Sequence, residues 1–180
     1  GSDRILQAMS RRHSIKAYRS LVDQLRHARS DMAFSSDFIV GFPGESDADF
    51  QSTLDLVDEI GFVGAYSFKY SARLGTPAAA MPDQVPDKTK SDRLKTLQGK
   101  LTASQAAFNS KTVGSKMPIL LDGYGRHPGQ LVGRSPYMQA VHVSAPAEQL
   151  GNIVNLRIEA AHPNSLAASY EGENCMKAIT

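Results

Sequence analysis

Residues 34–70 contain two short strand-like runs separated by an amphipathic helical segment. The first run, 34–40, ends at two closely spaced glycines, and the second, 65–70, is rich in aromatic residues. The segment between them carries apolar residues at helical spacing. It begins at Ser46, with Asp49 placed three residues on as in a capping box, and stops at Gly61. Strands separated by a helix of this length pair in parallel through a right-handed crossover. Further helices are expected over 3–9, 14–25 and 87–109, and Asp3 is the expected cap of the first.

Two parallel strands cannot complete a fold by themselves. Helices cover one face of such a pair, while the other face and the outer strand edges stay without partners. The N-terminal part of the chain, residues 1–113, is therefore expected to be a slice of a larger α/β barrel or open sheet.

The character of the sequence changes after residue 114. Short β-like runs alternate with glycine and proline, and the helical period disappears. Five short strands in about 60 residues indicate a small antiparallel β-barrel of the oligonucleotide-binding kind over residues 114–170. The last segment, 171–180, has little pattern and is interpreted as a loose tail. The expected strands are 117–121, 130–134, 138–143, 153–158 and 165–169.

The composition excludes several classes of protein. Hydrophobic residues make up 41% and charged residues 21%, which is ordinary for a globular domain. The apolar runs are too short to span a bilayer and no signal-peptide pattern opens the chain, so we expect no membrane partner and a cytoplasmic location. The single cysteine, Cys175, cannot hold an iron–sulfur cluster, and the histidines lack metal-ligand spacing, so no metal ligand is assigned. A net charge of +2 does not by itself indicate nucleic-acid binding.

The turn after the first strand is the strongest candidate for a ligand site. In α/β proteins, ligands bind at the carboxyl ends of strands, and glycines let the backbone approach a ring or a ribose closely. An ordinary glycine-rich turn between strand and helix is an equal alternative. The residues assigned to this candidate site are Ile39, Gly41, Phe42, Gly44 and Glu45.

Two further segments are able to contribute to the same site. Tyr70 and Ser71 follow the second strand and would lie beside the first turn, where Tyr70 offers a stacking surface. The basic segment 10–14 includes Arg11, which is able to reach an anionic ligand. Residue chemistry alone favours solvated connecting loops for both segments.

The β-rich part carries four candidates for nucleic-acid binding. Arg134 and Tyr137 lie in a loop between two expected strands and suit a phosphate or sugar contact and a base-stacking surface. Arg126 and Arg157 are expected to be secondary contributors. From residue 114 onward there are five Lys or Arg and five Asp or Glu residues, so this part would bind RNA weakly by itself. A packing module without RNA binding is the alternative.

Taken together, these segments resemble the radical-SAM methylthiotransferases, and the β-rich part resembles a TRAM domain. The similarity covers residues 1–169, and it is greater to the tRNA-modifying branch of the family than to the branch that modifies a ribosomal protein. The matching stretches are 1–11, 37–46 and 68–78 in the first part and 133–143, 150–158 and 164–166 in the second.

The resemblance implies a fold and a set of site residues. Residues 1–113 would form the C-terminal portion of a radical-SAM partial (β/α) barrel, residues 114–170 a five-stranded antiparallel, OB-like TRAM barrel, and residues 171–180 a tail. The implied cofactor-binding residues are Arg11, Ile39, Gly41, Phe42, Gly44, Glu45, Tyr70 and Ser71, and the implied RNA-binding residues are Arg134, Tyr137, Arg126 and Arg157.

The resemblance also implies a chemistry for the full-length enzyme. That enzyme would bind two [4Fe–4S] clusters and S-adenosyl-L-methionine, and would methylthiolate C2 of N6-isopentenyladenosine beside the anticodon of tRNA. The cluster-binding regions of the family are absent from this sequence, so no catalytic residue is assigned here and the chain alone is expected to be inactive.

The implied partners are the anticodon arm of tRNA and an electron donor such as a flavodoxin-type reductant, and we expect a monomer. Two alternatives stay open. The first is a non-catalytic RNA-binding module. The second is a methylthiotransferase that acts on another target, either threonylcarbamoyladenosine in tRNA or a ribosomal protein.

Overall fold

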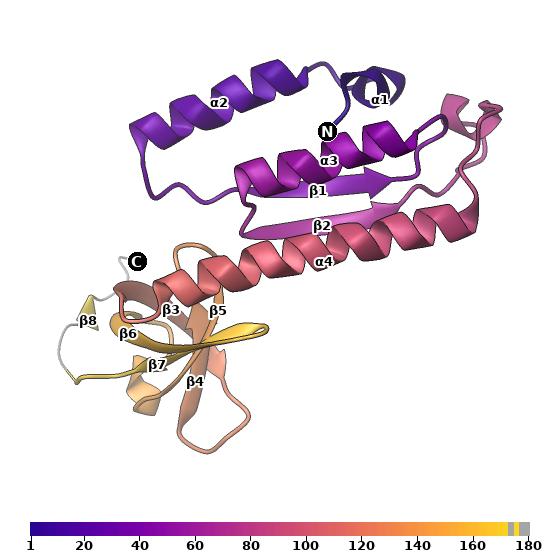
Figure 1. The fold of residues 1–180 in the computed structure, drawn as a ribbon. Helices are drawn as coiled ribbons and strands as arrows, with labels where there is room; N and C mark the ends of the chain where they lie inside the picture. Colours follow the sequence, from indigo (N-terminus) through magenta and orange to yellow (C-terminus); the bar gives the residue numbers. More distant parts are fainter. Residues whose placement is uncertain (173–174, 177–180) are drawn as a thin grey trace. The chain divides into compact units, whose positions relative to one another are not determined.

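The computed structural model describes residues 1–172 and 175–176, so most of the expected tail at 171–180 lies outside the described residues. The chain divides into two compact units, Gly1–Gln105 and Ala106–Thr180, whose elements are labelled in Figure 1. This division falls inside a long helix, and the boundary expected at residue 114 stays a prediction. Every helix in the described part of the chain is too short or too polar to cross a membrane.

The first unit alternates helices and strands in the order that the sequence predicts. β1 and β2 pair in parallel, with Ile39 opposite Phe68. Tyr70 lies just beyond β2, which ends one residue earlier than expected. The elements are α1 (Asp3–Ala8), α2 (Ile15–Ala28), β1 (Ser35–Val40), α3 (Asp47–Ile60), β2 (Gly64–Lys69), the 3-10 helix η1 (Pro77–Ala80) and α4 (Asp87–Thr112).

Local side-chain chemistry sets both ends of α3. The Ser46 hydroxyl accepts a hydrogen bond from the N–H of Asp49, and the Asp49 carboxylate accepts one from the N–H of Ser46. This is the predicted capping box, which satisfies two backbone donors at the start of the helix. Gly61 ends the helix with φ 64°, a left-handed conformation that glycine adopts without steric cost.

The start of α1 differs from expectation. Ser2, and not Asp3, caps the helix, because the Ser2 hydroxyl accepts from the N–H of Ile5. The Asp3 carboxylate instead accepts a hydrogen bond of 2.7 Å from the N–H of Ile15, the first residue of α2. Asp3 therefore joins two consecutive helices, a role that a pattern within one helix does not reveal.

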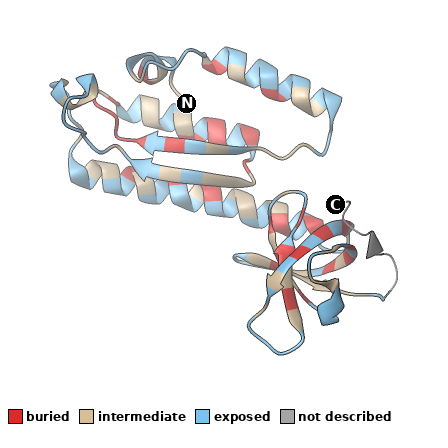
Figure 2. Ribbon diagram, turned by 180° about the vertical axis from the view of Figure 1, so that it is seen from behind, coloured by how far each residue is buried: buried red, intermediate tan, exposed pale blue. Residues whose placement is uncertain are grey.

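One face of the two-stranded sheet is buried and the other is open. Phe38 and Val40 pack with apolar residues of α2, α3 and α4, and these core positions are red in Figure 2. Ile39, Tyr66 and Phe68 lie on the opposite face and expose 39%, 73% and 54% of their surface. Side chains alternate between the two faces of a strand, which explains this split. In the described part of the chain, one face of the two-stranded sheet is thus left uncovered, as expected for two parallel strands.

Five strands of the second unit close into a barrel in the order β3-β4-β5-β7-β6, with β6 pairing back onto β3. Alternate apolar side chains fill its interior, and Ile119, Leu121 and Leu156 have no exposed surface. The elements are β3 (Lys116–Tyr124), β4 (Gln130–Arg134), β5 (Ala140–Ser144), the 3-10 helix η2 (Ala147–Gln149), β6 (Ile153–His162), β7 (Ser165–Ser169) and β8 (Cys175–Met176), which pairs with β6.

Two details of the expected barrel are wrong. β5 and β7 pair in parallel, whereas the other four pairs of the ring are antiparallel. A closed ring with an odd number of strands cannot reverse direction at every step, so at least one neighbouring pair must be parallel. Met138 lies outside β5, contrary to the expected strand 138–143, because its φ of 62° belongs to a turn.

The closest backbone approach in the barrel generates a prediction. A methyl group added at Gly133 on β4 would overlap the carbonyl oxygen of Leu120 on β3. We therefore expect Gly133→Ala to lower the free energy of unfolding by about 3 kcal/mol, the cost of overpacking, in denaturant unfolding followed by circular dichroism.

Gly99→Ala in α4 is the matched control, because nothing lies within 4 Å of the methyl group it adds. This control should raise the stability by about 1 kcal/mol, as expected for alanine inside a helix. Equal stability of the two variants would contradict the prediction.

Candidate functional site

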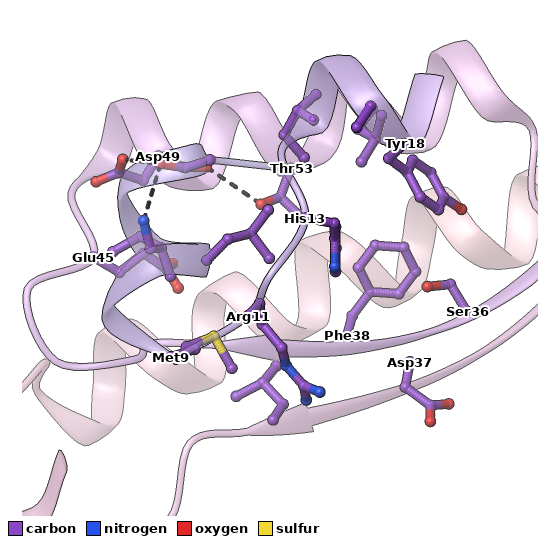
Figure 3. A pocket seen from close by; sticks show the side chains of 18 of the residues that line it. Met9, Arg11, His13, Tyr18, Ser36, Asp37, Phe38, Glu45, Asp49 and Thr53 are labelled. Carbon is purple, nitrogen blue, oxygen red and sulfur yellow. Dashed lines mark hydrogen bonds between the residues drawn. The ribbon is translucent and has the colours of Figure 1, made fainter. Parts of the chain in front are cut away.

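The first unit contains a cavity of about 600 Å³ lined by α1, α2, α3 and β1. Arg11 and His13 come from the loop between α1 and α2, whereas Ser36, Asp37 and Phe38 come from β1, as Figure 3 shows. The lining combines apolar side chains with a few polar groups. A cavity of this size and character suits a small ligand that has a flat apolar part and charged or hydroxylated ends.

Three of the predicted cofactor residues line this cavity, namely Arg11, Ile39 and Glu45. Asp37 and Tyr18 also line it, although the sequence reasoning did not select them. An acidic residue directly before the apolar run Phe38–Val40 was the available signal for Asp37. Burial raises the pKa of Tyr18, against the opposing charge of Arg26, so the phenol remains a hydrogen-bond donor at neutral pH.

Glu45 supports the turn between β1 and α3. Its Oε2 accepts a hydrogen bond of 2.6 Å from the N–H of Gly41, and its Oε1 lies 3.0 Å from Nη1 of Arg93 on α4. The side chains of Glu45 and Arg93 are only 6% and 8% exposed. Burial raises the pKa of Glu45, and the bonds from Gly41 and Arg93 oppose this rise. The pair joins residues 48 positions apart, so sequence reasoning missed Arg93.

The backbone donors of this turn are largely engaged within the protein. Gly41 donates to Glu45, the N–H of Gly44 donates to the Asp83 carbonyl at 2.7 Å, and the N–H of Glu45 donates to the Phe42 carbonyl at 2.9 Å. Gly41 and Gly44 have φ of 72° and 79°, which by itself accounts for glycine at both positions. The turn therefore shapes the backbone beside the cavity, and these three donors serve the protein's own acceptors.

The remaining predicted cofactor residues are absent from the described lining of the cavity. The rings of Phe42 and Tyr70 pack edge to face, with their centroids 5.2 Å apart, and Phe42 is buried. The Tyr70 hydroxyl is buried without a hydrogen-bond partner in the described part of the chain. Ser71 is exposed. Of the predicted residues, Arg11, Ile39 and Glu45 thus line the cavity, whereas Phe42, Tyr70 and Ser71 lie outside its described lining.

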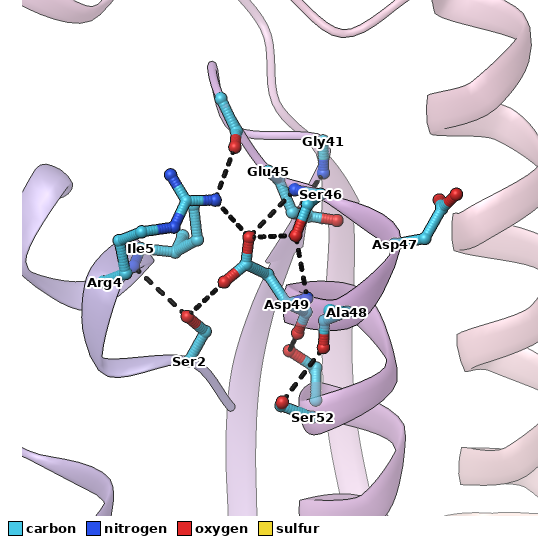
Figure 4. Close-up of polar contacts among 12 residues, drawn as sticks. Ser2, Arg4, Ile5, Gly41, Glu45, Ser46, Asp47, Ala48, Asp49 and Ser52 are labelled. Atoms are coloured by element: carbon cyan, nitrogen blue, oxygen red, sulfur yellow. Dashed lines mark hydrogen bonds and ion pairs between the residues drawn. The ribbon is translucent and has the colours of Figure 1, made fainter.

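Asp49 joins α1 to α3 beside the cavity, in the cluster drawn in Figure 4. Its carboxylate accepts hydrogen bonds of 2.6 Å from the hydroxyls of Ser2 and Ser46 and forms an ion pair with Arg4. Burial raises the pKa of Asp49, but the bonds from Ser2, Ser46 and Arg4 outweigh burial and hold the pKa below its usual range. Because Ser2 and Asp49 line the cavity, this cluster fixes part of its wall.

The four predicted RNA-binding residues of the second unit differ in their surroundings. Arg134 is exposed, with its Nη1 3.4 Å from the Met138 carbonyl. Tyr137 is half-buried and packs edge to face on Phe108 of α4, with the ring centroids 5.3 Å apart. Tyr137 therefore contributes to packing on α4, which limits its surface for stacking on a base.

The two secondary candidates also differ from each other. Arg157 pairs with Glu171 at 3.2 Å and donates to the Gly114 carbonyl at 3.1 Å. Arg126 is exposed in the loop between β3 and β4. Tyr124, at the start of that loop, exposes 68% of its surface and was not selected from the sequence. Exposed aromatic and basic side chains thus lie together at this loop.

Buried polar groups anchor the loop between β4 and β5. The Ser135 hydroxyl donates to Oε1 of Gln139 at 2.9 Å, and Nε2 of Gln139 donates to Oδ1 of Asn109 on α4 at 2.8 Å. All three residues are buried. The loop that follows Arg134 and carries Tyr137 is thereby fixed to the last turns of α4.

The buried pair in the first unit generates a prediction. Arg93→Leu would leave the Glu45 carboxylate buried without its cation, and we expect a loss of about 3 kcal/mol at neutral pH. Because the pKa of Glu45 is already raised, the loss should shrink as the pH falls and the carboxyl group takes up a proton. Denaturant unfolding at neutral and mildly acidic pH measures both effects.

Arg19→Leu is the control, since Arg19 and Glu59 form a pair whose side chains are 46% and 45% exposed. Its removal should cost much less than that of Arg93, because water screens an exposed ion pair. A similar cost for both variants, or a cost of Arg93→Leu that grows as the pH falls, would contradict the prediction.

Comparison with known proteins tests the family resemblance. Residues 110–170 match the TRAM domain family. Over 172 residues, which are 96% of this chain, the sequence is 54% identical to the tRNA-2-methylthio-N(6)-dimethylallyladenosine synthase of Maricaulis maris (strain MCS10). The matched part is 38% of that relative, so the chain spans well under half of its length.

These findings confirm the resemblance to tRNA methylthiotransferases and the TRAM domain, whose closed five-stranded barrel the structure contains. They do not test the radical-SAM partial barrel or the individual site residues, which stay predictions. The chain carries a TRAM domain and is similar, over nearly its whole length, to part of a tRNA methylthiotransferase.

Proposed function

We propose that the chain is the C-terminal part of a tRNA-2-methylthio-N(6)-dimethylallyladenosine synthase. The observation that carries this proposal is the 54% identity over 96% of the chain, which extends across both compact units. In the full-length enzyme, the first unit completes a radical-SAM partial barrel, and the TRAM domain holds the anticodon arm of tRNA. The enzyme works in the cytoplasm with a flavodoxin-type reductant as electron donor.

The open face of the sheet supports the partial barrel. Tyr66 and Phe68 present exposed apolar surface on the side away from the helices. Removing apolar surface from water is favourable, and unpaired strand edges gain hydrogen bonds from a neighbouring strand. Further strands of a barrel would satisfy both requirements at once.

The lining of the cavity fits S-adenosyl-L-methionine. Arg11 is a cation for the carboxylate of the ligand, Asp37 is an acceptor for its ammonium group or ribose hydroxyls, and Ile39 is an apolar surface for its adenine ring. Glu45 contributes by holding the turn in place. When bound to the full enzyme, this cofactor supplies a radical and a methyl group. The two [4Fe–4S] clusters take their ligands from elsewhere in that enzyme, because this chain has one cysteine.

The proposed function is tested by mass spectrometry of tRNA nucleosides. The full-length enzyme that contains this chain is expressed in a bacterium that lacks its own methylthiotransferases. Restored 2-methylthio-N6-isopentenyladenosine supports the proposal. Methylthiolated threonylcarbamoyladenosine or a methylthiolated ribosomal protein would instead assign another target, and the absence of any methylthiolated product would favour a non-catalytic RNA-binding module.

A prediction about the cofactor follows from the cavity. Arg11→Gln in the full-length enzyme should weaken S-adenosyl-L-methionine binding about tenfold, because it removes one charge-assisted hydrogen bond. Arg12→Gln is the matched control, since Arg12 is the next residue and is absent from the described lining. Calorimetric titration measures both affinities, and equal affinities would remove Arg11 from the site.

A prediction about tRNA concerns Arg134. Arg134→Ala in the full-length enzyme should weaken tRNA binding by about 1 kcal/mol and reduce the salt slope by about one, as expected for one phosphate contact. Arg157→Ala should have a smaller effect on tRNA affinity, because that guanidinium already pairs with Glu171. If Arg134→Ala lowers thermal stability while the tRNA affinity is unaltered, Arg134 has a structural role. That result would favour the alternative in which the barrel is a packing module without RNA binding.

A further inference from the structure

Three histidines of the second unit gather on the outer surface of the barrel around β5. The half-buried His142 on β5 stacks on His162 at the end of β6, with ring centroids 5.5 Å apart and planes inclined by 29°. His127 lies in the exposed loop between β3 and β4, near enough for its charge to act on His142. These three residues, here called the histidine face, come from three separate parts of the sequence.

The strand order gives the histidine face a position with a known physical use. In oligonucleotide-binding barrels, nucleic acid lies on the second and third strands and on the loops that join strands one to two and four to five. Counted from β3, the second and third strands are β4 and β5, and the two loops are 125–129 and 163–164. His127 lies in the first loop, His162 borders the second, and His142 lies on the third strand.

Few charged groups of the protein lie beside the histidine face, where they would compete with a ligand. On β4, the position opposite His142 is an apolar valine, and its neighbours on the same side are Gln130 and Arg134. β7 has no titratable side chain. On β6, Glu159 accepts a hydrogen bond of 2.6 Å from the Ser169 hydroxyl on β7. Within the described residues, no carboxylate is hydrogen-bonded to a ring of this face, so an external anion would meet little competition there.

The chemistry of stacked imidazoles makes such a face responsive to protons. Burial lowers the pKa of His142, and the nearby His162 and His127 lower it further, since adding a second positive charge beside a first is unfavourable. Protonation of His142 is therefore disfavoured in the free protein. A phosphate placed against the histidine face would reverse this balance, because it stabilises the protonated rings.

We propose that the histidine face is an RNA phosphate-binding site and that RNA binding to it takes up protons, so that the affinity rises as the pH falls. The inference rests on the proposed tRNA-binding function and adds a location and a pH response to it. The barrel needs such a source of positive charge, because from residue 114 onward its five basic residues are matched by five acidic ones.

The test measures binding of a fluorescein-labelled RNA hairpin, as long as an anticodon arm, to the full 180-residue chain by fluorescence anisotropy at constant salt. We expect about tenfold tighter binding near pH 6 than near pH 8, since a one-unit rise in the pKa of one imidazole corresponds to a tenfold change in affinity. In the double variant His142→Gln, His162→Gln, this pH dependence should fall below about twofold.

His27→Gln is the matched control, because His27 lies in α2, where its Nδ1 is 2.7 Å from the Asp23 carbonyl. This variant should keep the pH dependence of the unaltered chain. If the double variant melts at a lower temperature, His162→Gln alone carries the test, since His162 is exposed at the strand end and its loss should still weaken binding near pH 6.

Nuclear magnetic resonance titration of the histidine ring protons supplies a second readout. Added RNA should raise the pKa of His142 or His162 and leave that of His27 unchanged. An unchanged pKa at both rings, or a double variant that retains the pH dependence, overturns the histidine face while RNA binding itself stands. If the unaltered chain binds no RNA at either pH, both the inference and the proposed role of this chain in tRNA binding fail.

Discussion

A buried ion pair between Glu45 and Arg93 positions the turn on which the rest of the first unit depends. The carboxylate of Glu45 binds the N–H of Gly41 at the start of the turn, and the guanidinium of Arg93 ties that carboxylate to α4. Removing two charges from water is costly, so the pair is favourable only when each charge meets several partners in good geometry. Nη1 and Nη2 of Arg93 meet this condition by donating to the Glu45 carbonyl and to Asp47 as well, whereas its buried Nε has no hydrogen-bond partner in the described part of the chain. The path of the chain from β1 into α3, and with it one wall of the cavity, follows from this arrangement.

Features set by neighbouring residues could be predicted from the sequence, and features set by distant residues could not. The capping box at Ser46 and the end of α3 at Gly61 were predicted correctly because their chemistry is contained within a few residues. The ion pair between Glu45 and Arg93 was not predictable, because the two residues lie 48 positions apart. The same limit explains why the burial of Phe42 against Tyr70 was missed. Three of the eight residues assigned to the candidate site, Phe42, Glu45 and Tyr70, thus have side chains that the fold uses internally.

In the barrel, the closure of the ring sets the strand directions, which the alternation of apolar residues does not predict. Alternation of apolar residues located the strands, and β4 and β7 have the predicted bounds, but direction depends on how the ring closes. A closed ring of five strands must contain a parallel pair, and here that pair is β5 and β7. His142 on β5 stacks on His162 at the end of β6. The loop chosen from its composition serves a second purpose, since Ser135 and Gln139 anchor it to Asn109 of α4. Stiff glycine- and proline-containing loops are as suited to anchoring as to binding, so composition alone does not separate the two.

Polar groups that already have partners cannot bind a ligand without losing those partners, and this separates structural from ligand-binding residues at the cavity. Asp49 is engaged by Ser2, Ser46 and Arg4, and Glu45 is engaged by Gly41 and Arg93. In the described part of the chain, Arg11 and Asp37 line the same cavity without a hydrogen-bond or ion-pair partner. A ligand that brings a carboxylate to Arg11 and a donor to Asp37 therefore gains both interactions without breaking one in the protein. The satisfied groups hold the shape of the cavity, and we propose that the two unsatisfied ones favour a zwitterionic or hydroxylated ligand.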